Sequence, residues 1–255
     1  MSTSSFVDTG GLGSLRLDLF AGRQVLVTGG TSGIGNAVAK AFARVGAAVL
    51  ATGASDAEVA SARAEAVDLR FERLDVRDAV AVDGLVAGLA RLDVLVNCAG
   101  VIRRGDELDP AVFADVIDIN LNGSMRACAT ARPRLKETGG TIVNTASMLA
   151  FFGGGLVPGY SASKGGIAQM TKSLAIAYAA DGIRVNAVAP GWIATPLTAA
   201  LRDDPARNDP ILARTPMRRW GDPAEVAAGV VFLASPLASF VTGAVLVIDG
   251  GYLVA

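Results

Sequence analysis

The 255-residue sequence contains no histidine. This absence excludes catalysis by Ser-His-Asp or Cys-His arrangements, and it excludes metal sites built on imidazole ligands. A tyrosine or a carboxylate is then the side chain best suited to carry a proton, if the protein is an enzyme.

Cysteine is also scarce, with only Cys98 and Cys128 in the whole chain. Their spacing matches no zinc or redox motif. We interpret both as buried free thiols in a reducing compartment, which predicts a cytoplasmic protein. Since no cluster of ligands is visible either, the sequence predicts no metal site.

Charge of either sign is sparse, because charged residues make up 18% of the chain and the net charge is −1. Without a basic surplus or a block of like charge, nucleic acid is not an expected partner. Residues 1–18 have no signal-peptide pattern and are predicted to form a flexible extension. The uncharged run 226–248 is broken by Pro236 and Gly243, so we predict a helix followed by a strand there and no membrane span.

Apolar residues are abundant, at 51%, and the chain has 30 glycines, a composition that suits a sheet buried on both faces. Apolar runs alternate with helical stretches, which is typical of a parallel sheet. We therefore predict an α/β fold in which residues 19–255 form one doubly wound Rossmann-type domain, with a seven-stranded parallel sheet flanked by helices. The predicted strands are residues 23–28, 46–52, 69–76, 92–96, 141–147, 183–189 and 245–248.

A glycine-rich segment, Thr-Gly-Gly-Thr-Ser-Gly-Ile-Gly at residues 28–35, follows the first predicted strand and precedes a predicted helix at residues 36–45. Alone, such a cluster is more often a tight turn. In this βαβ setting it favours dinucleotide binding, because glycines let the backbone approach a phosphate and the helix supplies unpaired N–H groups.

The end of the second strand carries little information on cofactor choice. Gly53 stands where such folds often place an acid for the adenosine ribose. Ser55 and Glu58 match a capping box that opens a short helix. No lysine or arginine is present at Thr31, Ser32, Gly53 or Ala54 to bind a 2′-phosphate, so we expect NAD, with NADP not excluded.

Three residues suggest chemistry around the fifth strand. Ser147 ends that strand, while Tyr160 and Lys164 are four residues apart at the start of a predicted helix and so share one face. An adjacent ammonium favours the phenolate, so we expect Lys164 to lower the pKa of Tyr160. Tyr160 would then exchange a proton with a hydroxyl that Ser147 holds.

Other polar residues are predicted to converge on the same crevice, which in such sheets lies beyond the carboxyl ends of the strands. Asp75, Asn97 and the turn at residues 190–191 each follow a predicted strand. Asn120 lies between apolar neighbours in a helix predicted over residues 109–136, which indicates either a kink or a proton path.

Together these motifs resemble the short-chain dehydrogenase/reductase family over nearly the whole chain. The resemblance rests on residues 28–35, on Asn97-Cys98-Ala99-Gly100, and on four predicted catalytic residues, Asn120, Ser147, Tyr160 and Lys164. It implies that Tyr160 is the general acid/base, that Ser147 bonds the reacting oxygen, and that Lys164 binds the nicotinamide ribose. Asn120 would hold a water that leads from Lys164 to solvent. Cys98 departs from the family's usual second asparagine.

The resemblance also implies binding residues. Those for the cofactor are Gly29, Thr31, Ser32, Gly33, Ile34, Gly35, Gly53, Asp75, Val76, Asn97, Ala99, Gly100, Tyr160, Lys164, Pro190, Gly191, Ile193 and Thr195. A closer likeness to the family's sugar-acid branch, carried by residues 101–104, 146–149, 189–195 and 218–221, suggests substrate contacts. These are Arg103, Arg104, Ser147, Met148, Tyr160, Trp192 and Arg202.

The leading hypothesis is hydride transfer between a nicotinamide cofactor and a secondary alcohol or ketone of a sugar acid or 2-keto-3-deoxy sugar acid. A 3-oxoacyl-thioester reductase that uses NADPH is an alternative in the same class. A non-catalytic dinucleotide-binding sensor or scaffold is an alternative of another class. The resemblance further implies a homotetramer.

Overall fold

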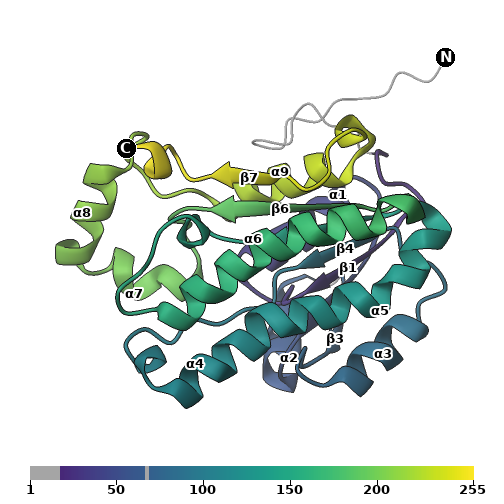
Figure 1. The fold of residues 1–255 in the computed structure, drawn as a ribbon, viewed down its shortest axis with the longest axis horizontal. Helices are drawn as coiled ribbons and strands as arrows, with labels where there is room; N and C mark the ends of the chain where they lie inside the picture. The colour runs from purple at the N-terminus through teal and green to yellow at the C-terminus, as the bar shows by residue number, and fades with distance from the viewer. Residues whose placement is uncertain (1–17, 67–68) are drawn as a thin grey trace.

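The computed structural model describes residues 18–66 and 69–255, which fold around one seven-stranded parallel sheet (Figure 1). The strand order is β3-β2-β1-β4-β5-β6-β7, as in a doubly wound fold. The strands are β1 (Gln24–Thr28), β2 (Ala48–Gly53), β3 (Arg70–Arg73), β4 (Val94–Asn97), β5 (Thr141–Thr145), β6 (Arg184–Pro190) and β7 (Val245–Ile248). This confirms the predicted sheet. The predicted N-terminal extension, up to residue 17, lies outside the described residues.

The central strands have apolar side chains on both faces because both faces are covered. In β1, Val25 and Val27 belong to the hydrophobic cluster on one side of the sheet, and Leu26 belongs to the cluster on the other. Each is essentially inaccessible to solvent. Burying side chains of this size contributes about 1.5–3 kcal/mol each, so neither face tolerates a polar substitution here.

Helices form the two outer layers (Figure 1). Side chains of α1 (Gly33–Arg44), α2 (Asp56–Glu65) and α9 (Pro223–Ala234) pack in the first cluster. Side chains of α3 (Ala79–Ala87), α5 (Gly123–Thr138) and α6 (Pro158–Tyr178) pack in the second. α4 (Pro110–Ile117) packs against α6, and α7 (Ala199–Arg202) and α8 (Pro205–Arg214) lie past the arrowheads of β6 and β7 (Figure 1).

The predicted helix over residues 109–136 is interrupted. A π-helical turn, Asp118–Asn122, separates α4 from α5 and contains the fully buried Asn120. The wider turn locally changes the register between side chains and the helix axis, and such turns are frequent at functional sites. The sequence left either a kink or a proton path open at this asparagine, and the structure has a π-helical turn there.

The uncharged run near the C-terminus forms α9 and then β7, as predicted. Within residues 18–66 and 69–255, no helix has both the length and the apolar character needed to cross a membrane.

The start of α2 differs from the predicted capping box. The Ser55 hydroxyl accepts a hydrogen bond from the Glu58 N–H at 3.3 Å, which is half of that motif. The Glu58 carboxylate, however, reaches past Ser55 and accepts from the Ala54 N–H at 2.8 Å. Its side chain therefore lies at the end of β2.

Candidate active site

Ser147, Tyr160 and Lys164 lie together where β5 ends and α6 begins. Pro158 occupies the first position of α6, where its missing N–H costs nothing, and places Tyr160 in the first turn. The Lys164 Nζ lies 5.4 Å from the centroid of the Tyr160 ring and donates to the Thr145 carbonyl oxygen at 2.6 Å. The Ser147 hydroxyl lies close enough to the Tyr160 phenol to lower the pKa of that group.

Burial dominates the electrostatics of this group. It raises the pKa of Tyr160. The nearby Ser147 hydroxyl offsets part of that rise, and the Glu107 charge adds to it. Burial also lowers the pKa of Lys164 to about 8. The expectation that Lys164 lowers the Tyr160 pKa is therefore wrong for the protein alone, because desolvation disfavours both charged forms.

A cavity of about 440 Å³ extends from Tyr160 and Lys164, which line it, to the glycine-rich loop, whereas Ser147 is not part of its lining. Most of the predicted cofactor residues line it, from several strand ends. They are Gly29, Thr31, Ser32, Gly33, Ile34, Gly35, Asp75, Val76, Ala99, Gly100, Tyr160, Lys164 and Thr195. The parallel sheet thus brings together residues spread over 167 positions of the chain, from Gly29 to Thr195.

The glycine-rich end of the cavity has the chemistry of a phosphate site. No side chain caps the first turn of α1 at Ser32, and no acidic residue lies in that turn. Its N–H groups and the positive end of the helix dipole thus suit an anion. Gly29 has φ +64°, and a Cβ there would lie 2.6 Å from the Ala99 backbone, so only glycine allows this close packing. The residues present fit a dinucleotide.

Five predicted cofactor residues do not line this cavity in the described structure: Gly53, Asn97, Pro190, Gly191 and Ile193. Asn97 is buried between strands, and its Nδ2 donates to the Asn144 Oδ1 at 2.9 Å. Gly191 packs on Asp249, since a Cβ at Gly191 would lie 2.6 Å from the Asp249 Cβ. Asn97 and Gly191 therefore contribute to packing near the strand ends and not to the cavity wall.

Asn120 links the loop after β4 to α6. Its Oδ1 accepts from the Val101 N–H at 2.8 Å, and its Nδ2 donates to the Val101 carbonyl at 3.0 Å and to the Ser163 Oγ at 3.1 Å. A Cβ at Gly100 would lie 3.3 Å from the Asn120 Oδ1 and 3.8 Å from the Lys164 Nζ. Asn120 therefore fixes the strip of backbone that faces Lys164.

The candidate substrate arginines are not equivalent. The Arg103 guanidinium is 3.1 Å from the Asp115 carboxylate and is therefore already paired. Arg104 and Arg202 are exposed, and neither forms an ion pair with another residue of the described chain. Met148, directly after Ser147, is buried.

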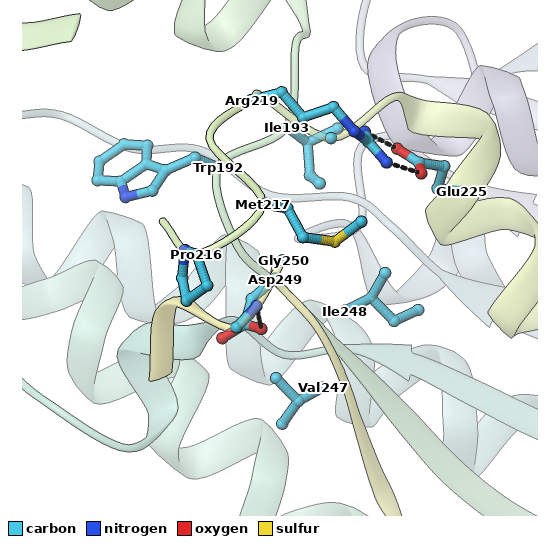
Figure 2. A pocket seen from close by; sticks show the side chains of 12 residues that line it. Trp192, Ile193, Pro216, Met217, Arg219, Glu225, Val247, Ile248, Asp249 and Gly250 are labelled. Atoms are coloured by element: carbon cyan, nitrogen blue, oxygen red, sulfur yellow. Dashed lines mark hydrogen bonds and ion pairs between the residues drawn. The ribbon is translucent and has the colours of Figure 1, made fainter. Parts of the chain in front are cut away.

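Trp192 lies beside a second cavity, of about 510 Å³, between β7 and the segment before α9 (Figure 2). Its ring meets Trp220 and Tyr252 edge to face, with centroids 5.7 and 6.2 Å apart. Ile193 and Met217 also line this cavity, and an Arg219–Glu225 ion pair stands at its edge (Figure 2). None of the four predicted catalytic residues lines it, so the chemistry belongs to the smaller cavity.

Sequence reasoning missed several residues of the smaller cavity, including Glu58, Arg77, Cys98 and Thr145. The Arg77 guanidinium binds Asp75 at 2.7 Å and lowers the pKa of that carboxyl. Burial raises the pKa of Cys98. Only Arg77 could have been predicted from the sequence, because it stands two residues after Asp75, which was already expected at a strand end.

Comparison with known proteins agrees with this geometry. A family model described as "Enoyl-(Acyl carrier protein) reductase" matches residues 29–253. The chain is 40% identical over 243 residues to 2-dehydro-3-deoxy-D-gluconate 5-dehydrogenase of Bacillus subtilis (strain 168), covering 91% of this chain and 95% of that relative. It is 44% identical to cis-4-hydroxycyclohexanecarboxylate dehydrogenase of Sinomonas cyclohexanicum, covering 92% and 98%.

Among solved structures, one described as a putative NAD(P)-dependent gluconate 5-dehydrogenase from Beutenbergia cavernae, with NADP bound at low occupancy, superposes with a TM-score of 0.86. Its identity is 40%, and the match covers 92% of this chain and 98% of that one. The chain belongs to the short-chain dehydrogenase/reductase family. Membership in this family confirms the prediction of an NAD(P)-dependent oxidoreductase that acts on a CH–OH group.

Proposed function

We propose that this short-chain dehydrogenase/reductase interconverts a secondary hydroxyl and a ketone on a sugar acid or 2-keto-3-deoxy sugar acid. The names of the Bacillus subtilis and Beutenbergia cavernae relatives support this substrate class. The substrate named for the Sinomonas relative also combines a hydroxyl and a carboxylate in one small molecule.

The observation that carries the proposed chemistry is the placement of Tyr160, with Ser147 beside it, in a cavity that Lys164 and the glycine-rich loop also line. In the oxidation direction, Tyr160 accepts the hydroxyl proton while Ser147 holds the reacting oxygen. The nicotinamide, when bound, supplies the hydride acceptor. Lys164 binds the nicotinamide ribose and places a positive charge beside Tyr160, and Asn120 holds the adjoining backbone in place.

The ionisation of Tyr160 sets a condition on this scheme. Because burial raises its pKa, the phenolate needs positive charge close by before it forms near neutral pH. Lys164 with a pKa of about 8 is still mostly protonated at pH 7 and provides part of that charge. The positively charged, oxidised nicotinamide ring would supply the rest. We therefore expect the pH dependence of the reaction to differ between the oxidised and the reduced cofactor.

A substrate panel tests the proposal. Purified protein is assayed at 340 nm with sugar acids, 2-keto-3-deoxy sugar acids and simple alditols, each with NAD and with NADP. We expect turnover to favour the acids over alditols of equal length. The description of the matching family model favours a second candidate, a reductase of acyl thioesters. A preference for 3-oxoacyl thioesters with NADPH would replace the sugar-acid proposal.

We also propose a cytoplasmic homotetramer that prefers NAD. The exposed apolar side chains Met125 on α5 and Ile176 on α6 support pairing of the long helices between subunits. The free thiols of Cys98 and Cys128 support a reducing compartment. Light scattering that finds only monomers would refute the tetramer.

A further inference from the structure

The end of the cavity next to β2 contains a carboxylate that the sequence did not place there. Glu58 belongs to α2, yet its Oε2 accepts from the Ala54 N–H at 2.8 Å, just after the last residue of β2. The Glu58 side chain extends past Ser55, the N-cap residue of α2. Its carboxylate therefore lines the cavity together with Thr31 and Asp75. This part of the cavity lies next to the glycine-rich loop, near the carboxyl ends of β2 and β3.

Gly53 and Glu58 are sterically linked. A Cβ at Gly53 would lie 2.6 Å from the Thr31 Cγ2 and 3.0 Å from the Glu58 Oε2. The space that an acidic side chain at position 53 would need is thus already filled by Thr31 and by the Glu58 carboxylate. The chain places its carboxylate at this strand end from position 58 instead of position 53.

The charge around this carboxylate is not balanced. Two cations line the same cavity. Lys164 donates to the Thr145 carbonyl oxygen, and the Arg77 guanidinium lies 2.7 Å from Asp75 and 2.9 Å from Asp115. Glu58 forms no ion pair with another described residue, and its second oxygen, Oε1, accepts no hydrogen bond from one. That oxygen is free to accept from a ligand hydroxyl, and it would repel a ligand phosphate.

We propose that Glu58 recognises the hydroxyls of the adenosine ribose and thereby makes the site select NAD over NADP. This inference rests on the proposed function, since it assumes that the cavity holds a nicotinamide dinucleotide. The relatives do not decide the matter, because the 40% identical structure from Beutenbergia cavernae is described as NAD(P)-dependent and contains NADP at low occupancy.

Binding measurements without turnover test the proposal. Dissociation constants for NADH and NADPH are measured by fluorescence titration for the wild type, Glu58→Gln and Glu65→Gln. Glutamine keeps an acceptor for the Ala54 N–H, so the start of α2 should persist, and thermal unfolding checks this. Glu65 is an exposed residue of the same helix outside the cavity, so Glu65→Gln makes the same change in net charge.

We expect the wild type to bind NADH more tightly than NADPH. In Glu58→Gln, the affinity for NADPH should rise about tenfold and the affinity for NADH should fall about threefold, the sizes of effect expected from removing one charge–charge repulsion and one charged hydrogen bond. Glu65→Gln should change neither. Added salt should reduce the difference between the NADH and NADPH affinities of the wild type, because it screens the repulsion between Glu58 and the extra phosphate of NADPH. Glu58→Gln lacks this repulsion, so salt should not change its cofactor preference.

Tighter wild-type binding of NADPH, or equal changes in Glu58→Gln and Glu65→Gln, would overturn the proposal. A failure of the proposed function gives a different result. If no sugar acid is turned over, the two dissociation constants and their dependence on Glu58 are unaffected.

Discussion

Lys164 is a buried cation, and replacing it should change how stability depends on pH. Burial lowers the pKa of Lys164 from 10.5 to about 8. In the unfolded chain this amine keeps its proton up to pH 10.5, whereas in the folded protein it loses the proton above about pH 8. Raising the pH between these values therefore stabilises the folded state, and below pH 8 the folded state bears the whole cost of the buried charge.

The pKa difference sets the size of the effect. One pKa unit corresponds to about 1.4 kcal/mol, so a fall from 10.5 to about 8 corresponds to roughly 3 kcal/mol. Lys164→Met keeps the length of the side chain and removes the titration. The free energy of unfolding of the wild type minus that of Lys164→Met should rise by about 2–3 kcal/mol between pH 7 and pH 10.

Urea unfolding of both proteins, followed by circular dichroism across this range, measures the difference. The two cysteines also titrate differently in the folded and unfolded chain, since burial raises the pKa of Cys98 and brings that of Cys128 to about 12. Both thiols are present in both proteins, so their contributions largely cancel. A difference that stays flat from pH 7 to pH 10 would refute the account of Lys164 as a desolvated amine.

Three further predictions concern the residues that support the site. Gly29→Ala should destabilise the fold by more than 2 kcal/mol, a typical cost of overpacking, because its Cβ would lie 2.6 Å from the Ala99 backbone. Gly22→Ala is its control, with a similar φ of +73° but open space around the Cβ, and equal losses in urea unfolding would contradict the steric argument. Glu107→Gln should lower the free energy of unfolding by about 1–3 kcal/mol. The buried Glu107 carboxylate accepts hydrogen bonds from the backbone N–H groups of Arg103 and Tyr160, whereas a glutamine amide has only one oxygen that can accept. An unchanged midpoint of urea unfolding would disprove this. Gly53→Asp should lower the midpoint of thermal unfolding, because Thr31 fills the space beside Gly53. Adding Thr31→Gly to this variant should restore part of the lost stability. If the double variant instead loses the sum of the two single losses, the two residues are not coupled.

Much of the fold was predictable because the buried strands have a strong apolar pattern. The central strands β1, β4 and β5 are short apolar segments with glycine or polar residues at their ends, and all three were found within a few residues of their bounds. The parallel arrangement followed from the alternation with helices. The sheet then brings Tyr160 and Lys164 beside the glycine-rich loop, as predicted from the chain order.

The errors have identifiable physical causes. The π-helical turn around Asn120 was not predicted, because its residues also fit an α-helix. The hydrogen-bond partners of Asn120, Val101 and Ser163, are distant from it in the sequence. The Glu58 carboxylate was assigned to a capping box because the spacing fits, whereas the structure takes it one residue further. The Tyr160 pKa was misjudged because the sequence shows the neighbouring amine but not the burial of both groups.

The central claim is that the Tyr160 hydroxyl transfers the proton, and Tyr160→Phe tests it most directly. The variant removes the phenolic oxygen, whose pKa the nearby Ser147 lowers, and keeps the ring that packs near Lys164. NADH formation at 340 nm, on the best substrate from the panel, should fall by about 10²-fold or more, while the dissociation constant for NADH should change less than about threefold, since the ring remains in place. Turnover within tenfold of the wild type, with cofactor binding intact, would contradict the account.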